Sequence, residues 1–325
     1  MFDSFWSPSS SEFYHTLGGA MRRRFGCNVW KVSIDAGFSC PHVSRGEVGK
    51  DLVLNRGGCI FCNMSSFSPG RNLVSGKSIC EQIDEGIIRL KRHYPKVDKF
   101  IAYFQPSTNT NAPPERLKLL YREAIVHPDV VGLSIGTRPD CLSEGVLDVL
   151  EEVGQEKYLQ LEIGLQSVHQ KSLDFLNRGY DYVEFLESYG RVCGRGIDVC
   201  LHLIIGTPVE GRDDVIETAR EVARLKPSGL KLHNLHVVRD TVLADLWRSG
   251  GVELLTVEEY SGLVVDFLEC IPPEVVVERV SAEVNSDFAI APDWVKIKHA
   301  ARNEIQKTFK KRNSHQGKYY TPPPQ

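Results

Sequence analysis

Short apolar segments alternate with amphipathic ones along most of the chain from Lys31 onward. Six apolar segments are predicted to be strands, at residues 32–35, 100–104, 130–135, 159–164, 199–205 and 230–235. The amphipathic segments between them are predicted to be helices, at 78–92, 114–126, 143–153, 170–177 and 213–225. Strands that alternate with helices form a parallel sheet with right-handed crossovers. The sequence therefore predicts an α/β protein.

Polar residues lie on one face of four consecutive predicted strands, and this distinguishes an open sheet from a barrel. The opposite face is apolar, as with Leu161 and Ile163 on the fourth strand. The polar set includes Ser134, Gln160, Glu162, Cys200, His202, Lys231 and His233. A sheet between two helix layers is apolar on both faces. We therefore predict a partial (β/α)6 barrel similar to the TIM barrel, with its chemistry at the C-terminal ends of the strands.

The alternation ends near Gly251, which divides the chain into an N-terminal segment (1–27), the partial barrel (28–250) and a small α+β C-terminal extension (251–325). The extension has a predicted helix at 257–270, a strand-like VVVERV at 275–280 and a basic helix at 293–312. The basic helix carries seven lysines and arginines against Glu304 and the Asp293 at which it begins. Such a helix either contacts nucleic-acid phosphates or is a solvated face.

The amino-acid composition and charge indicate which broad classes of protein the chain can belong to. The 325 residues are 42% hydrophobic and 25% charged, which is ordinary for a globular protein. A net charge of -3 argues against a strongly basic nucleic-acid binder, although a local basic patch is compatible with it. The sequence has no secretory signal and no apolar run of membrane-spanning length, so we expect a cytoplasmic protein without a membrane partner. Nine cysteines in a reducing compartment favour metal binding over disulfides.

Three of these cysteines, Cys40, Cys59 and Cys62, lie on one glycine-rich loop that follows the first predicted strand. Closed zinc sites and electron-transfer clusters usually have four protein ligands. Three thiolates would leave one iron of a cluster open to another ligand. The alternative is a zinc site with His42 as the fourth ligand. The other six cysteines have no ligand spacing and are expected to pack as small hydrophobes.

The motifs around the loop and along the strands carry a family resemblance. They read KVSIDAGFSCP, GGCIFCN, AYFQPSTNTNAP, GLSIGTRPD, LEIGLQSVHQKSLDFLNRGYD, HLIIGTPVEGRDD and GLKLHNLHVVRDT. In this order, over about residues 14 to 245, they resemble the radical S-adenosylmethionine (SAM) enzymes, and more closely a bacterial subfamily related to the Elongator catalytic subunit. The usual superfamily motif is CxxxCxxC. Here the first two cysteines are farther apart, as in that subfamily.

The resemblance implies two cofactors. Cys40, Cys59 and Cys62 would hold a [4Fe–4S] cluster whose fourth iron is chelated by SAM. An electron from the cluster would cleave SAM to methionine and a 5′-deoxyadenosyl radical that abstracts hydrogen from the substrate. Because this reduction needs a low potential, the expected electron donor is a flavodoxin or a ferredoxin. The protein's own task would be to position the cofactors and exclude water.

The resemblance also implies roles for single residues. Phe61 and the turn at Gly206 would lie near adenine, Gln105 and Ser107 near the SAM amino group, and Glu162 and Gln166 near ribose and methionine. Further candidates at the strand ends are Ser134, Arg138 and His233. Arg138 would bind a carboxylate or form a surface salt bridge, and His233 is either a ligand or a core residue. Lys231 is expected near the substrate or paired with Glu162, and these two are the catalytic candidates.

The substrate is indicated only through the resemblance. The Elongator relation implies a transfer-RNA target, with the carboxymethylaminomethyl group on wobble uridine converted to aminomethyl. The basic C-terminal helix and Arg22, Arg23 and Arg24 could contact phosphates. Two alternatives stay open. One is a radical SAM enzyme that acts on a small metabolite or a protein side chain, and the other is a non-catalytic zinc or iron–sulfur binding protein.

Overall fold

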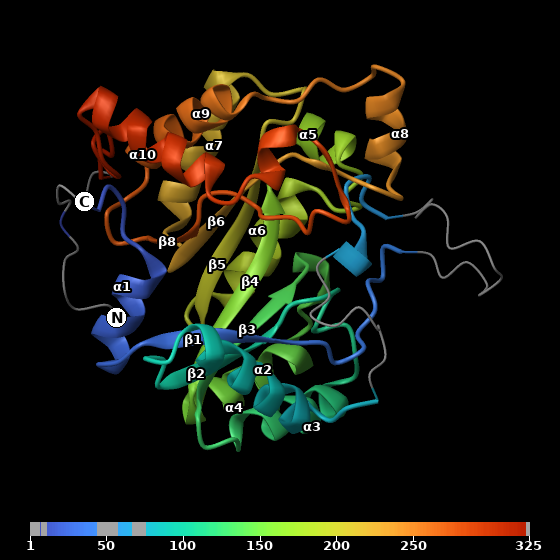
Figure 1. Cartoon of the computed structure of the whole chain (residues 1–325). Helices are drawn as coiled ribbons and strands as arrows, with labels where there is room; N and C mark the ends of the chain where they lie inside the picture. Colours follow the sequence, from blue (N-terminus) through green and yellow to red (C-terminus); the bar gives the residue numbers. More distant parts are fainter. Residues whose placement is uncertain (1–6, 8–11, 44–57, 67–75, 323–325) are drawn as a thin grey trace.

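The computed structural model describes residues 7, 12–43, 58–66 and 76–322. Within these residues the main sheet has seven parallel strands in the order β1-β2-β3-β4-β5-β6-β8 (Figure 1). They are β1 (Val29–Ile34), β2 (Lys99–Phe104), β3 (Val130–Thr137), β4 (Tyr158–Gln166), β5 (Asp198–Ile205), β6 (Gly229–Asn234) and β8 (Val276–Arg279). The six predicted strands are all present, and neighbours in the chain are neighbours in the sheet. The α/β prediction is confirmed.

The sheet is curled, so its two edge strands approach one another. β1 and β8 occupy opposite ends of the strand order. Even so, the Nζ of Lys31 on β1 lies 2.8 Å from Oε2 of Glu278 on β8. One side-chain contact can join the two edges only if the sheet closes part of the way into a barrel. The predicted partial barrel is therefore confirmed as a curled half-barrel.

Ten α-helices occur in the described part of the chain, and most of them connect successive strands (Figure 1). They are α1 (Leu17–Phe25), α2 (Ile79–His93), α3 (Pro114–Ile125), α4 (Glu144–Glu156), α5 (Gln170–Phe175), α6 (Tyr182–Val192), α7 (Arg212–Leu225), α8 (Val242–Arg248), α9 (Val257–Glu269) and α10 (Ala300–Arg312). The five predicted connecting helices are present. α1, α6 and α8 were not predicted.

The helices cover the apolar face of the sheet, where the strand side chains form a single large core. Leu161, Leu201 and Leu230 are each fully buried there. α2 approaches β1 so closely that a Cβ built on Gly86 would lie 2.3 Å from Cγ1 of Val32. Glycine at this position is required by the spacing between helix and strand.

Two features of the C-terminal region differ from the sequence prediction. The segment expected as a strand of the extension is β8, which pairs in parallel with β6 and adds a seventh strand to the barrel sheet. The basic helix is interrupted, because a 3-10 turn at Asp293–Lys296 is separated from α10 by His299 in the left-handed region, with a φ of 63°. A continuous helix cannot include such a residue.

A small second sheet pairs β7 (Val237–Val238) with β9 (Ala289–Ala291) in antiparallel orientation. It connects the end of the barrel sheet to the segment that follows β8. None of the helices in the described part of the chain has the length and apolar character needed to span a membrane.

Candidate active site

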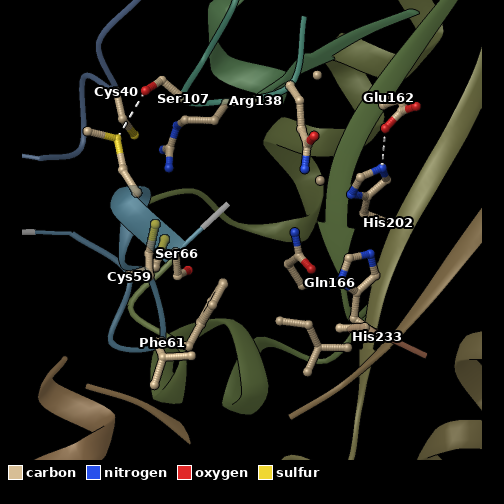
Figure 2. Close-up of a pocket in the computed structure, with 18 of the residues that line it drawn as sticks. Cys40, Cys59, Phe61, Ser66, Ser107, Arg138, Glu162, Gln166, His202 and His233 are labelled. Carbon is tan, nitrogen blue, oxygen red and sulfur yellow. Dashed lines mark hydrogen bonds and ion pairs between the residues drawn. The ribbon is translucent and has the colours of Figure 1, made fainter. Parts of the chain in front are cut away.

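A cavity of about 400 Å³ lies at the C-terminal ends of the barrel strands. Figure 2 shows Cys40, Cys59 and Phe61 on one side of it, and His202 and His233 on the other. The residues from the sequence prediction that line it are Cys40, Cys59, Phe61, Cys62, Gln105, Ser107, Arg138, Glu162, Gln166 and His233. The predicted location of the chemistry, at the strand ends, matches the cavity.

The cysteine side is organised by Arg178, which the sequence analysis did not select. Arg178 is 8% exposed, and its Nη1 donates to the Sγ of Cys59 at 3.1 Å. Its Nε donates to the hydroxyl of Tyr180 at 3.0 Å, and that hydroxyl donates in turn to the carbonyl of Gly164 at the end of β4. Arg178 and Tyr180 both belong to LNRGYD, the end of one of the motifs that carry the family resemblance. This motif was the sequence signal that could have identified them as site residues.

The donor set fits an iron–sulfur cluster. Burial, together with the neighbouring Cys59 and Cys40, raises the pKa of the Cys62 thiol to about 12. Such thiols need bound cations to become thiolates, and metal coordination deprotonates a thiol outright. Arg178 already supplies the kind of N–H donor to sulfur that tunes clusters.

The zinc alternative finds less support in the same geometry. Zinc needs its ligands around one point, about 2.0–2.3 Å from each donor atom. His42, the proposed fourth ligand, has its Nε2 2.7 Å from the carbonyl oxygen of Asn177. Three cysteines that each bind a different iron do not have to converge on one ion.

Four of the predicted SAM-binding residues line the cavity. Gln105 accepts from the hydroxyl of Ser33 at 3.0 Å, and Ser107 donates to the sulfur of Met64 at 3.0 Å. Gln166 ends β4 with a φ of 69°, a conformation that turns its amide into the cavity between the two walls (Figure 2). Phe61 is partly buried on the cysteine side. Their roles toward SAM stay predictions.

Arg138 has a different environment from either expectation. It is 5% exposed, so its ion pair is not a surface salt bridge. Its Nε and Nη2 each contact a carboxylate oxygen of Asp140 at 2.9 Å, and its Nη1 donates to the carbonyl of Arg178 at 3.0 Å. The guanidinium fork is thus already filled by a carboxylate of the protein itself.

Three other predicted site residues do not line the cavity. Gly206 has a φ of 95° and lies against Leu255. Ser134 is fully buried and donates to Oε1 of Glu162 at 2.7 Å. Lys231 is 4% exposed, with its Nζ 2.5 Å from Oε2 of Glu162. Of the two positions considered for Lys231, the structure thus gives pairing with Glu162. Ser134 and Lys231 lie beneath the cavity and can position Glu162 there.

Glu162 is the centre of a buried polar network that forms the floor of the cavity. Its Oε1 accepts from Lys31 Nζ at 2.7 Å as well as from Ser134. Its Oε2 accepts from the hydroxyl of Tyr103 at 2.6 Å and lies 2.8 Å from Nε2 of His202. Strands β1 to β6 therefore each contribute one side chain to the network around this carboxylate. β8 joins the same network through Glu278.

Electrostatics keep this network ionised. Burial alone would raise the pKa of Glu162, but Lys231, Lys31 and the hydrogen bond from His202 outweigh burial and hold that pKa well below its usual value. Burial tends to lower the pKa of Lys31 and Lys231, yet the two carboxylates raise both. His233 has no such partner in the part of the chain that the structure describes, and burial followed by the charge of Arg279 lowers its pKa well below 6.5. It is therefore neutral at pH 7.

Several residues of the buried network or the cavity lining had no site role in the sequence analysis. They are Lys31, Tyr103, Arg178, His202, Asn234, Glu278 and Arg279. His202 was placed on the polar face. Glu278 had the same signal as Glu162, a single acid in an apolar strand, but its strand was assigned to the extension.

Comparison with known proteins identifies the family. The model described as "Radical SAM superfamily" matches residues 55–222, which is half of the chain and includes Cys59 and Cys62. The chain belongs to the radical SAM superfamily. A second model, "Radical_SAM C-terminal domain", matches residues 227–311. The protein is therefore a radical SAM enzyme, and the family implies a [4Fe–4S] cluster and SAM as its cofactors.

Two bacterial relatives match this chain over nearly their full length. It is 38% identical to the protein YtqA of Bacillus subtilis over 308 residues, 94% of this chain and 92% of YtqA. It is 34% identical to YhcC of Escherichia coli over 292 residues, 90% of each chain. It is also 32% identical to human Elongator complex protein 3, but over only 158 residues, 47% of this chain and 28% of that protein.

A solved structure with a similar fold is also an Elongator protein 3. Elp3 of the archaeon Methanocaldococcus infernus, with its N-terminus deleted, superimposes with a TM-score of 0.68 over 89% of this chain and 64% of that chain. The identity is 17%, so the likeness shows the fold alone. The expected half-barrel of the radical SAM type, followed by a C-terminal region, is confirmed.

Proposed function

We propose that this radical SAM enzyme modifies the wobble uridine of transfer RNA, converting its carboxymethylaminomethyl group to aminomethyl. The observation that carries the proposal is the arrangement of the cavity. Three cysteines with a buried arginine form one wall, and an ionised network around Glu162 forms the floor opposite. The relation to Elongator complex protein 3 supports an RNA substrate.

The chain's residues have separable tasks in this proposal. When bound, the cluster and SAM supply a one-electron reduction that generates a hydrogen-abstracting 5′-deoxyadenosyl radical. Cys40, Cys59 and Cys62 hold the cluster, and Arg178 stabilises the thiolate of Cys59. Gln105, Ser107, Gln166 and Phe61 orient SAM in the cavity. A low-potential donor of the flavodoxin or ferredoxin class delivers the electron.

The proposed conversion is a two-electron oxidation that balances. One hydrogen atom leaves the methylene carbon next to the carboxylate and becomes part of 5′-deoxyadenosine. With SAM as the oxidant, loss of one further electron and one proton from the resulting radical would give a carbon–nitrogen double bond. Water adds across it and the bond breaks. The products are the aminomethyl group and glyoxylate, and no further oxidant is needed.

The surface that would contact RNA phosphates includes α10. Ile305 and Phe309 bury its apolar side, with the ring of Phe309 stacked on Phe13 at 5.4 Å. Lys310 and Lys311 are exposed on the same helix. Exposed lysines of this kind give a salt-dependent contribution to RNA affinity. α1 follows Phe13 in the chain and exposes Arg22.

Nucleoside mass spectrometry on transfer RNA from a deletion strain tests the proposal. We expect carboxymethylaminomethyluridine to accumulate and aminomethyluridine to fall, with restoration by the wild-type gene. Anaerobic purified enzyme should release glyoxylate from the modified RNA in the amount of 5′-deoxyadenosine formed. An unchanged wobble-uridine profile would favour the alternative, a small metabolite or protein side chain as substrate.

A further inference from the structure

Arg279 is a cation at the cavity wall without a partner in the described part of the chain. It ends β8, lines the cavity and is exposed. No hydrogen bond or ion pair joins its guanidinium to any residue in the described part of the chain. Arginine's planar fork matches a carboxylate in a bidentate geometry. The role expected of Arg138, recognition of a free carboxylate, is thus available to Arg279, because Asp140 already fills the fork of Arg138.

The charges at the floor of the cavity balance one another and leave Arg279, at the wall, uncompensated by them. Three cations, Lys31, Lys231 and Arg279, face two ionised carboxylates, Glu162 and Glu278. The lysines and the carboxylates pair with one another, Lys31 with both at 2.7 and 2.8 Å. His202 and His233 have lowered pKa values, first through burial, and add no charge at pH 7. Glu283, the other carboxylate at the cavity, lies toward His299 instead of Arg279. Arg279 is therefore the cation that can complement a negative charge on a ligand.

Two neighbouring side chains on β6 each have one polar atom without a partner among the described residues. Asn234 is 2% exposed and lines the cavity. Its Oδ1 accepts from the backbone N–H of Ala282 at 3.0 Å, which fixes the orientation of the amide, while its Nδ2 has no partner among the described residues. Nε2 of His233 is likewise buried and unpartnered there. Buried polar atoms of this kind usually meet a partner, so a ligand is the natural candidate.

The position of these groups separates them from the amino-acid end of SAM. β6 and β8 are adjacent, with Lys231 opposite Arg279 in the register. The charge of Arg279 acts on Lys231, His202 and His233, and the two histidines lie across the cavity from the cysteines (Figure 2). A SAM carboxylate that chelates iron must instead lie at the cysteine wall. Glu283, also at the cavity, lies 3.5 Å from His299.

We propose that Arg279, together with the Nδ2 of Asn234, binds the carboxylate of the substrate's carboxymethylaminomethyl group. This inference rests on the proposed function, since it takes that group as the substrate. It makes Arg279 the residue that distinguishes the substrate from the product, because the aminomethyl product has lost the carboxylate. A substrate site built to pair a charge discriminates strongly against a ligand that lacks it.

Calorimetric titration with two free nucleosides tests the inference without turnover. Wild-type enzyme with cluster and SAM bound should bind 5-carboxymethylaminomethyluridine roughly 10- to 100-fold more tightly than 5-aminomethyluridine, the range for a charge-assisted pair. Arg279→Gln should abolish this preference, Arg279→Lys should retain part of it, and Arg122→Gln, at an exposed outer-helix ion pair, should leave it intact. SAM affinity should not change in Arg279→Gln.

The outcomes separate this inference from the proposed function. A wild-type preference that persists in Arg279→Gln, or no preference at all, overturns the inference. Weaker SAM binding by Arg279→Gln in the absence of nucleoside also overturns it, because Arg279 would then bind the SAM carboxylate. An Arg279-dependent preference combined with an unchanged transfer-RNA profile in the deletion strain overturns the RNA function and leaves the carboxylate site standing.

Discussion

Lys31, on the first strand of the sheet, lies 2.8 Å from Glu278, on the last. The same ammonium lies 2.7 Å from Glu162, on the strand in the middle. One buried lysine thus joins three strands across the inside of the half-barrel. Because these buried charges compensate one another together with Lys231, the network fixes the spacing of the walls beneath the cavity. The floor on which the proposed substrate rests depends on this pairing.

Removal of the central carboxylate should be strongly destabilising. Glu162→Gln leaves Lys31 and Lys231 with one carboxylate between them, and breaking a buried ion pair costs about 3–5 kcal/mol. We expect the free energy of unfolding in urea to fall by about that amount. The matched control is Glu156→Gln, which breaks the exposed pair with Arg122 and should cost about 0–1 kcal/mol. Equal losses in the two variants would contradict the network's structural role.

Stability should decrease as the pH falls below about 6.5. The pKa of His233 is well below 6.5 in the folded protein, first because of burial, whereas the unfolded chain takes up the proton near pH 6.5. Between these two values the unfolded state binds more protons, so acid favours unfolding by about 1.4 kcal/mol per pH unit. Urea titrations from pH 7.5 to 5.5 should show a shallower slope for His233→Gln. An identical slope would mean that His233 is protonated in the fold.

Arg178 should tune the cluster rather than hold it. Arg178→Met removes a cation and an N–H donor from the Sγ of Cys59. Both losses destabilise the reduced, more negative cluster, so the reduction potential should fall, by an amount on the order of tens of millivolts. Redox titration followed by electron paramagnetic resonance measures it, with Arg122→Met as the control. A higher potential, or no shift, would show that the hydrogen bond to sulfur has no such effect.

Replacement by alanine should have opposite effects on stability at two helical glycines, because only one of them lies where a helix closely approaches a strand. A Cβ at Gly86 would lie 2.3 Å from Val32, so Gly86→Ala should destabilise the protein by about 1–3 kcal/mol. Gly190 on α6 has nothing within 4 Å of such a Cβ, so Gly190→Ala should stabilise it by roughly 0.5–1 kcal/mol. Thermal unfolding compares them. Val32→Ala should relieve much of the Gly86→Ala loss, and no relief would contradict the proposed clash.

Hydrophobic periodicity was sufficient for the predicted strands and the helices that connect them, because local patterning determines which face of each element is buried. It was insufficient for β8, since the pairing of the 275–280 segment with β6 depends on a contact distant in sequence. The helix at α6 could have been found from its capping box, in which Asp181 and Glu184 bond to each other's backbone N–H groups.

The site was predictable where a motif lies on one short segment, as with the three cysteines. Only some of the residues that form the floor of the cavity could be predicted. Alternation placed Glu162 and Lys231 on the inner face, but their partners Lys31 and Glu278 come from the two edge strands. Those partners meet only after the sheet curls, and the degree of curl cannot be determined from local sequence.

Anaerobic reconstitution of Cys59→Ala beside Cys193→Ala tests the central claim, that three thiolates leave one iron open to SAM. Cys193 is exposed and does not line the cavity, so it is the matched control. The account predicts that wild type and Cys193→Ala hold a [4Fe–4S] cluster, change its paramagnetic resonance on addition of SAM and form 5′-deoxyadenosine. Cys59→Ala should lose all three while keeping its fold by circular dichroism. Unaltered SAM cleavage by Cys59→Ala, or zinc bound to the wild-type cysteines, would contradict the account.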